Sequence, residues 1–219
     1  DHDLTIGVRV HEDEEDRFQE EDAYRLEGGR LILTAAGAAG SNANRVSSGE
    51  AVALFVQDRL TLDRLTVTAG ARFEDYELTR EDFSTADPTR AVGPTRGRTL
   101  DDQVVVPGLS ALYELNDDLT LLAGVHRGFA IASPGATDAD AEESVNWEAG
   151  GRFSRDGLDV EAIAFFNDYS NLLGTCTASS GGNCTIGDQF DGGDVDVMGL
   201  ELTASWDAAT LFDTSLSLP

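Results

Sequence analysis

The sequence predicts an all-β chain that forms part of an antiparallel transmembrane β-barrel. Apolar and polar residues alternate with a period of two in several segments, as in strands that have one apolar and one polar face. These segments are joined alternately by short turns and long polar loops. No apolar run reaches the length of about 20 residues that a membrane-spanning helix needs, whereas a barrel strand needs only about ten.

The alternation defines eight strands and the start of a ninth. In residues 145–153 the odd-numbered positions are apolar or glycine, whereas the even-numbered positions include Glu148 and Arg152. The same division recurs in residues 4–10, 51–62, 65–73, 104–115, 119–129, 158–166 and 198–206. It is clearest in residues 65–73 and 198–206. We expect a ninth strand to begin near Thr214. Asp58 interrupts the second strand, where we expect a bulge or the membrane boundary.

The connections between these segments alternate in length. Short turns are expected at residues 63–64, 116–118 and 154–157, with a looser one at 207–213. Long polar loops are expected at residues 12–48, 79–101, 131–142 and 173–194. Because outer-membrane barrels have short periplasmic turns and long extracellular loops, the strands that follow the short turns run outward.

The aromatic residues and the cost of burying charge decide how the strands face. In this orientation Trp147 and Phe166 lie toward the outer rim, while Tyr113 and Trp206 lie toward the periplasmic rim, as the aromatic girdles of a barrel require. Placing Arg152 in lipid would cost roughly 2–4 kcal/mol near the midplane. We therefore expect the polar face to line the interior.

The charge and the motifs limit the possible functions. The 219 residues carry a net charge of -26, with 41 acidic and 15 basic side chains. A nucleic-acid surface needs clustered cations, so nucleic acid is not an expected partner. The sequence contains neither a GxSxG nucleophile elbow nor a phosphate-binding glycine loop, and we expect no enzymatic activity. A soluble acidic β-sandwich would also alternate, but apolar faces rich in Ala and Gly favour the barrel.

Six segments, which together cover most of the chain after about Ser48, carry a family resemblance. They are AVALFVQDRLTL from Ala51, LTVTAGARFEDYEL from Leu65, LTLLAGVHRGFA from Leu119, ESVNWEAGGRF from Glu143, GLDVEAIAFFNDYSNLLG from Gly157 and GDQFDGGDVDVMGLEL from Gly187. In their order and spacing they are similar to the TonB-dependent receptor family of the outer membrane. The similarity is to its ferric citrate (siderophore) receptor branch in particular.

This resemblance implies a barrel of about 22 strands that is filled by an N-terminal plug domain and energised through TonB. Residues 1–219 would be a fragment of the β-barrel domain, without the plug domain and the C-terminal strands. The protein would lie in the lipid of the bacterial outer membrane and import a ferric chelate, either ferric citrate or another iron siderophore. It would contact the TonB complex through the N-terminal region and hold no permanently bound cofactor. A passive porin or adhesin barrel and the soluble β-sandwich are the alternatives.

Three arginines are candidates for binding the chelate. Arg90, Arg96 and Arg98 lie in one long loop with no acidic residue between them, in an otherwise acidic chain. An anionic chelate needs cations or donors to replace its hydration, and the guanidinium fork matches carboxylates. The simpler interpretation is a solvated loop whose arginines pair with Asp87, Asp101 and Asp102.

A histidine and two cysteines complete the set of candidate residues. His126 is on the inward face and is either a ligand contact or a lumen histidine bonded to a neighbouring strand or to the plug. Cys176 and Cys184 lie in one long loop, and at an oxidising cell surface a disulfide is the natural interpretation, with two free thiols as the alternative. The acidic residues after Gly187 do not have EF-hand spacing, so we expect no metal site.

Overall fold

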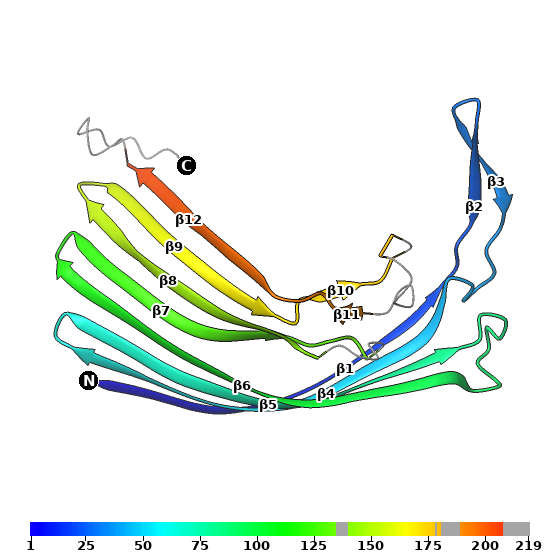
Figure 1. Ribbon diagram of the computed structural model, residues 1–219, viewed down its shortest axis with the longest axis horizontal. Helices are drawn as coiled ribbons and strands as arrows, with labels where there is room; N and C mark the ends of the chain where they lie inside the picture. Colours follow the sequence, from blue (N-terminus) through cyan, green and yellow to red (C-terminus); the bar gives the residue numbers. More distant parts are fainter. Residues whose placement is uncertain (135–139, 178, 181–188, 208–219) are drawn as a thin grey trace.

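The computed structural model describes residues 1–134, 140–177, 179–180 and 189–207, and these form one antiparallel sheet with two small hairpins (Figure 1). The order of strands in the sheet is β1-β4-β5-β6-β7-β8-β9-β12. Their bounds are β1 (His2–Gln19), β4 (Ala43–Leu62), β5 (Leu65–Phe83), β6 (Pro94–Asn116), β7 (Leu119–Ala130), β8 (Glu142–Arg155), β9 (Leu158–Ser170) and β12 (Val195–Trp206). The eight predicted strands are confirmed, and the ninth, near Thr214, falls outside the described residues. Among the described residues no helix has the length and hydropathy to cross a membrane.

The two ends of the sheet differ in the way that the sequence predicts. The tight turns between β4 and β5, β6 and β7, and β8 and β9 gather at one end, and the longer connections lie at the other (Figure 1). Asp63 has φ 53°, and Asp156 and Gly157 have φ 49° and 76°. Positive φ at the centre of a two-residue hairpin matches the twist of the flanking strands, and Asp and Gly tolerate it best. The short turns predicted at residues 63–64, 116–118 and 154–157 are therefore confirmed. The looser turn expected at 207–213 lies outside the described residues except for Asp207.

The long connections contain more structure than the sequence predicts. Two hairpins, β2 (Ala23–Glu27) with β3 (Arg30–Ala35) and β10 (Leu173–Thr175) with β11 (Gln189–Asp191), lie within them. β1 continues to Gln19 and β4 begins at Ala43, so most of the loop expected at residues 12–48 is wrong. The loop expected at 79–101 shrinks to residues 84–93. Beyond the membrane both faces of a strand meet water. The apolar alternation therefore disappears, although the hydrogen-bonded pairing of the backbone continues.

One face of the sheet is apolar across its whole width, and we call it the lipid face. Paired residues share a face, and one row of partners crosses all eight strands through Leu4, Asp58, Ala69, Leu109, Val125, Trp147, Phe166 and Met198. In the described part of the chain no second layer covers this row, since Trp147 is 52% and Met198 71% exposed. So large an apolar surface belongs against lipid. The soluble β-sandwich, which would cover it with a second sheet, is contradicted.

Asp58 is the charged member of this row. The ladder between β4 and β5 runs through Asp58 without a shift in register, so the bulge that the sequence suggests is wrong. Asp58 lies four residues before the end of β4, close to the turn end of the sheet. Its Oδ2 lies 2.8 Å from Nδ1 of His2, on the neighbouring strand. The position fits the alternative expectation, a charge near the periplasmic boundary of the membrane.

The strands are longer than a membrane requires. β6 has 23 residues, whereas about ten residues suffice to cross the bilayer. β1, β4 and β5 have 18, 20 and 19 residues. The ends of these four strands opposite the tight turns therefore extend beyond the membrane. We call the face opposite the lipid face the lumen face. On the extended ends of these strands, the lumen face is accessible to a ligand from outside the cell.

Candidate ligand-binding site

Five arginines gather on the lumen face at the outer ends of β1, β4, β5 and β6. The register places Arg17, Arg45, Asp82 and Arg96 in one row across the four strands. The next row toward the membrane holds Glu15, Ser47, Arg80 and Arg98. We call Arg17, Arg45, Arg80, Arg96 and Arg98 the arginine cluster. Alternation puts all five side chains on the same side of the sheet.

The cations of the arginine cluster outnumber the carboxylates between them. Asp82 Oδ1 accepts hydrogen bonds from Nε and Nη2 of Arg80 at 2.9 and 2.7 Å, and Asp82 Oδ2 lies 3.6 Å from Nη2 of Arg98. Glu15 is 3.9 Å from Nη2 of Arg45. Among the described residues of these two rows, five guanidinium groups thus lie beside two carboxylates. The surplus of positive charge favours an anion on this part of the lumen face.

Arg45 is the member with the clearest unmet need for an acceptor. Its side chain is 23% exposed, and its Nε is buried without a hydrogen-bond partner among the described residues. A buried donor without a partner is rare and costs free energy. An anion with several oxygen atoms would supply the missing acceptor and form charge-assisted hydrogen bonds with the neighbouring guanidinium groups.

The structure changes the surroundings expected for Arg96 and Arg98. Both lie in β6, on the lumen face, and not in a loop. Arg98 forms an ion pair with Asp82 of β5. Arg17, Arg45 and Arg80 could not be recognised as candidates from the local sequence, because they become neighbours only through the register of strands that lie far apart in the chain. Extending the alternation of each strand past its apolar part would have put them on the inward face.

Arg90 does not join the arginine cluster. It lies in the connection between β5 and β6, and its Nη1 and Nη2 donate hydrogen bonds to Oδ2 and Oδ1 of Asp16 at 3.0 and 2.6 Å. Asp16 is the partner of Val46 in β4, so it belongs to the face opposite the cluster. The hydrogen bonds and the charge of Asp16 raise the pKa of the Arg90 guanidinium. The structure thus separates Arg90 from Arg96 and Arg98.

His126 faces the lumen at a different depth. It pairs with Gly108 of β6 and Asn146 of β8, and its side chain is exposed. Gly108 lies ten residues from Arg98 along β6, which corresponds to about 33 Å. His126 lines a hollow of about 410 Å³ together with Phe55, Gln57, Arg72 and Glu148. Because of this separation, His126 and the arginine cluster cannot hold the same small ligand.

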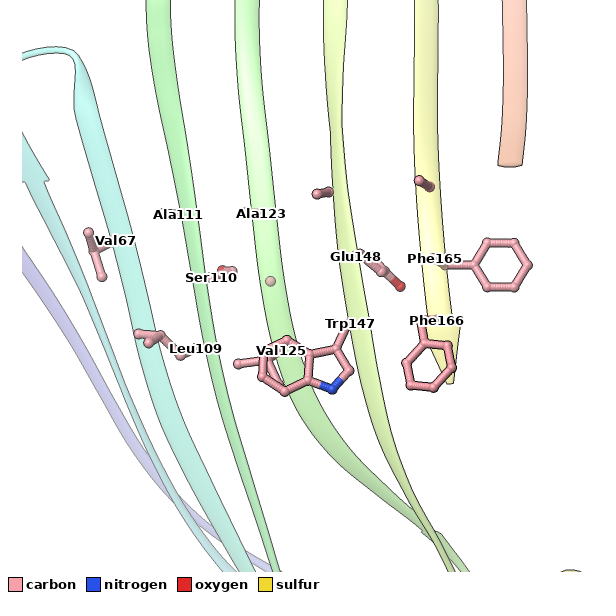
Figure 2. A pocket seen from close by; sticks show the side chains of 13 residues that line it. Val67, Leu109, Ser110, Ala111, Ala123, Val125, Trp147, Glu148, Phe165 and Phe166 are labelled. Carbon is pink, nitrogen blue, oxygen red and sulfur yellow. The ribbon is translucent and has the colours of Figure 1, made fainter. Parts of the chain in front are cut away.

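A second hollow lies on the lipid face and has a different character. It measures about 650 Å³ and is floored by Ala111, Ala123, Ala149 and Ala164. Figure 2 shows Val125, Trp147 and Phe166 along one side of it, in the order of their strands. The wall is almost wholly apolar, and a binding site for a ferric chelate needs polar groups that fix its orientation. This hollow is therefore part of the surface against lipid.

The cysteines and the acidic residues add no further site. Cys176 is buried and disulfide-bonded, while Cys184 lies outside the described residues, so the pairing of these two remains a prediction. In the part of the chain that the structure describes, no group of three or more His, Cys, Asp or Glu side chains is placed to hold a metal ion.

The predicted disulfide can be tested with a thiol reagent of high mass. In the denatured full-length protein without reductant, we expect maleimide polyethylene glycol to label neither Cys176 nor Cys184, because both sulfurs are oxidised. After reduction we expect two labels. The variant Cys184→Ser should take one label with or without reductant. Labelling of the unreduced wild type at both positions would show two free thiols instead.

Comparison with known proteins gives one consistent result. The family model for the TonB dependent receptor-like β-barrel matches residues 1–218. The chain is 28% identical to the ferric enterobactin receptor of Pseudomonas aeruginosa over 182 residues, which are 78% of this chain and 23% of that protein. It is 29% identical to the ferrienterobactin receptor of Escherichia coli K12 over 138 residues, which are 58% of this chain and 18% of that protein. The chain thus spans about a quarter or less of these relatives.

Solved structures show the same fold. The unliganded ferric citrate transporter FecA matches with a TM-score of 0.66 and 22% identity, over 96% of this chain and 30% of that one. The ferric yersiniabactin uptake receptor FyuA from Yersinia pestis matches with a TM-score of 0.64 and 19% identity, over 94% and 30%. Copper transporter OprC matches with a TM-score of 0.65 and 15% identity, over 94% and 32%. At these identities the likeness concerns the fold alone.

Proposed function

Because this chain belongs to the TonB dependent receptor-like β-barrel family, we propose that it is part of the wall of an outer-membrane transporter that imports a ferric chelate with energy from TonB. The family consists of outer-membrane β-barrel receptors, and the location of the chain follows from its membership. The relatives support iron chelates as cargo, since two of them are receptors for ferric enterobactin. The whole protein would contain a plug domain and further strands beyond residues 1–219.

The observation that carries the proposal is the arginine cluster on the lumen face. The surplus of cations at the outer mouth favours an anionic cargo, and membership of the receptor family favours active import over passive diffusion. We propose that Arg45, Arg80, Arg96 and Arg98 bind the oxygen atoms of an anionic ferric chelate, with ferric citrate as the representative ligand. The ligand is cargo and no permanent cofactor is involved. The role is transport and not catalysis.

We propose a separate, later role for His126. Its hollow lies deeper along the lumen face than the arginine cluster, and it contains Arg72 and Glu148 with opposite charges. A group at this depth can contact cargo only after it leaves the outer site, or contact the plug domain. The disulfide of Cys176 would keep the connection between β9 and β12 compact at the cell surface.

Growth on defined iron sources tests the transport proposal. A strain that lacks the full-length receptor should lose growth on at least one anionic ferric chelate in a panel of ferric citrate, catecholate and hydroxamate chelates, and keep growth on ferrous salts. A strain without TonB should show the same loss, because the family draws its energy from there. Normal growth of the receptor deletion on the whole panel, in a strain with no second receptor, would refute the proposal.

A further inference from the structure

The connection between β5 and β6, residues 84–93, is fastened to the neighbouring strands through Arg90. Besides its two hydrogen bonds to Asp16 in β1, Arg90 donates one from Nε to Oδ1 of Asn44 in β4 at 2.7 Å. A guanidinium group presents its donors in a rigid planar fork, so three bonds to two strands fix both its position and its angle. Its side chain is 21% exposed.

Aromatic and amide groups complete these contacts. The guanidinium carbon of Arg90 lies 4.9 Å from the ring centroid of Phe83 and 5.7 Å from that of Phe18, within the range of cation–π attraction. Asn44 is 4% exposed, and its Nδ2 donates to the carbonyl oxygens of Ser84 and Asp87 at 2.9 and 3.1 Å. We call Arg90, Asp16, Phe18, Asn44 and Phe83 the Arg90 network.

The backbone of Arg90 adopts a conformation that is unusual for an arginine. Its φ is 57°, a left-handed conformation that non-glycine residues adopt rarely and at a cost in free energy. Glycine would adopt this conformation more easily. An arginine in this conformation is explained by the contacts that its side chain makes with β1 and β4.

The Arg90 network and the arginine cluster share the same stretches of backbone. Phe18, Asn44 and Phe83 are the sequence neighbours of Arg17, Arg45 and Asp82 respectively. Because successive side chains of a strand point to opposite faces, each contact of Arg90 on one face fixes a member of the outer row on the other. The two sets are thus coupled through three strands without touching each other.

We propose that Arg90 is a positioning residue for the arginine cluster: it holds the outer ends of β1, β4 and β5 in register and so fixes the spacing of the guanidinium groups, without contacting the ligand. This inference rests on the proposed function, in that the cluster is taken to bind an anionic chelate. It assigns Arg90 a role different from the ligand contact that the sequence suggested.

The test compares two substitutions of Arg90 in the purified full-length receptor, with ferric citrate as the probe. Both R90A and R90G remove the side chain, but only glycine suits the left-handed backbone conformation. We expect both variants to bind ferric citrate on the order of tenfold more weakly, the usual size of coupling between two sites. We also expect faster amide hydrogen exchange at residues 43–47 and 80–84, because local opening becomes easier. Heat-modifiable migration on gels should stay normal, which shows an intact barrel.

R25A is the matched control. Arg25 forms an exposed ion pair with Glu27 at 2.8 Å on the β2–β3 hairpin, so its loss removes one positive charge from the outer end without touching the Arg90 network. It should change neither affinity nor exchange at residues 43–47. If R90G behaves as the wild type, the contribution is a backbone effect and the proposal is wrong.

Two other outcomes separate this inference from the proposed function. Faster exchange at residues 43–47 with unchanged affinity for ferric citrate would show that Arg90 stabilises the strands but does not position the cluster, and would overturn the inference. If the wild type does not bind ferric citrate or any other chelate of the growth panel, the proposed function fails. In that case the hydrogen-exchange measurement alone decides whether Arg90 fixes the backbone of the arginine cluster. Unchanged exchange in R90A would refute this role.

Discussion

Replacing Ala111 by arginine is expected to destabilise the full-length barrel by about 2–4 kcal/mol, whereas the same substitution at Ser110 should change the stability little. Ala111 is on the lipid face, in a row with Val67, Ala123 and Ala149. An arginine there has no polar partner and must lose its hydration in hydrocarbon. At Ser110 the side chain points into the lumen, where water and other polar groups are available.

The two neighbouring positions form a matched pair. They lie on the same strand at nearly the same depth, so they differ chiefly in the face that the side chain occupies. Ser110 pairs with Gly124, which in turn pairs with Glu148, so an arginine at position 110 would lie near a carboxylate. Any loss of strand propensity is similar in the two variants and cancels in the comparison.

The difference in stability between the two variants can be measured in lipid vesicles, by reversible unfolding of the receptor with guanidinium chloride. The midpoint of unfolding should fall for A111R and remain close to the wild type for S110R, with unchanged slopes. The opposite order, with S110R the less stable variant, would mean that the faces are reversed. Equal and small effects would mean that neither face meets lipid.

The part of the fold inside the membrane could be predicted from the sequence because its physical cause is visible there. Lipid on one side and a polar interior on the other force the alternation around Trp147, and a turn such as that at Asp63 ends each strand. The outer part could not be predicted in the same way. From His11 to Gln19 both faces meet water, so β1 has no apolar pattern although its backbone is fully paired with β4.

The candidate site shows the same limit. Arg96 and Arg98 were recognised because they stand out in an acidic chain, but their partners Arg45 and Arg80 come from other strands. No local pattern connects residue 45 with residue 96, since their adjacency depends on the register of three strands. Arg90 resembles Arg96 in sequence context, and only the path of the chain between β5 and β6 places it on the other face.

The second large effect is expected for the double variant R80Q/R98Q in the full-length receptor. Hydrogen bonds to charged groups contribute about 1.5–3 kcal/mol each, and every 1.4 kcal/mol corresponds to a factor of about ten in affinity. Losing two such cations should weaken binding of ferric citrate by roughly 100-fold or more. Glutamine keeps much of the side-chain length and some hydrogen-bonding capacity, so the change isolates the positive charge.

Two further variants identify the cause of this loss. Removing both arginines leaves Asp82 without its described partners, and its charge would then repel an anionic ligand. In R80Q/R98Q/D82N this repulsion is absent, so binding that stays weak shows that the cations themselves are required. R152Q is the matched control, because Arg152 also faces the lumen but pairs with Glu161 near the turn between β8 and β9.

Calorimetric titration with ferric citrate at two salt concentrations gives the measurement. Wild-type affinity should fall as salt rises, because part of the arginine cluster is exposed and its attraction is screened. The affinity of R80Q/R98Q should be low and less sensitive to salt, and that of R152Q should equal the wild type. If R80Q/R98Q binds as tightly as R152Q, the chelate does not bind at the arginine cluster. The surplus of cations on β4, β5 and β6 would then have to serve the contact with another part of the protein.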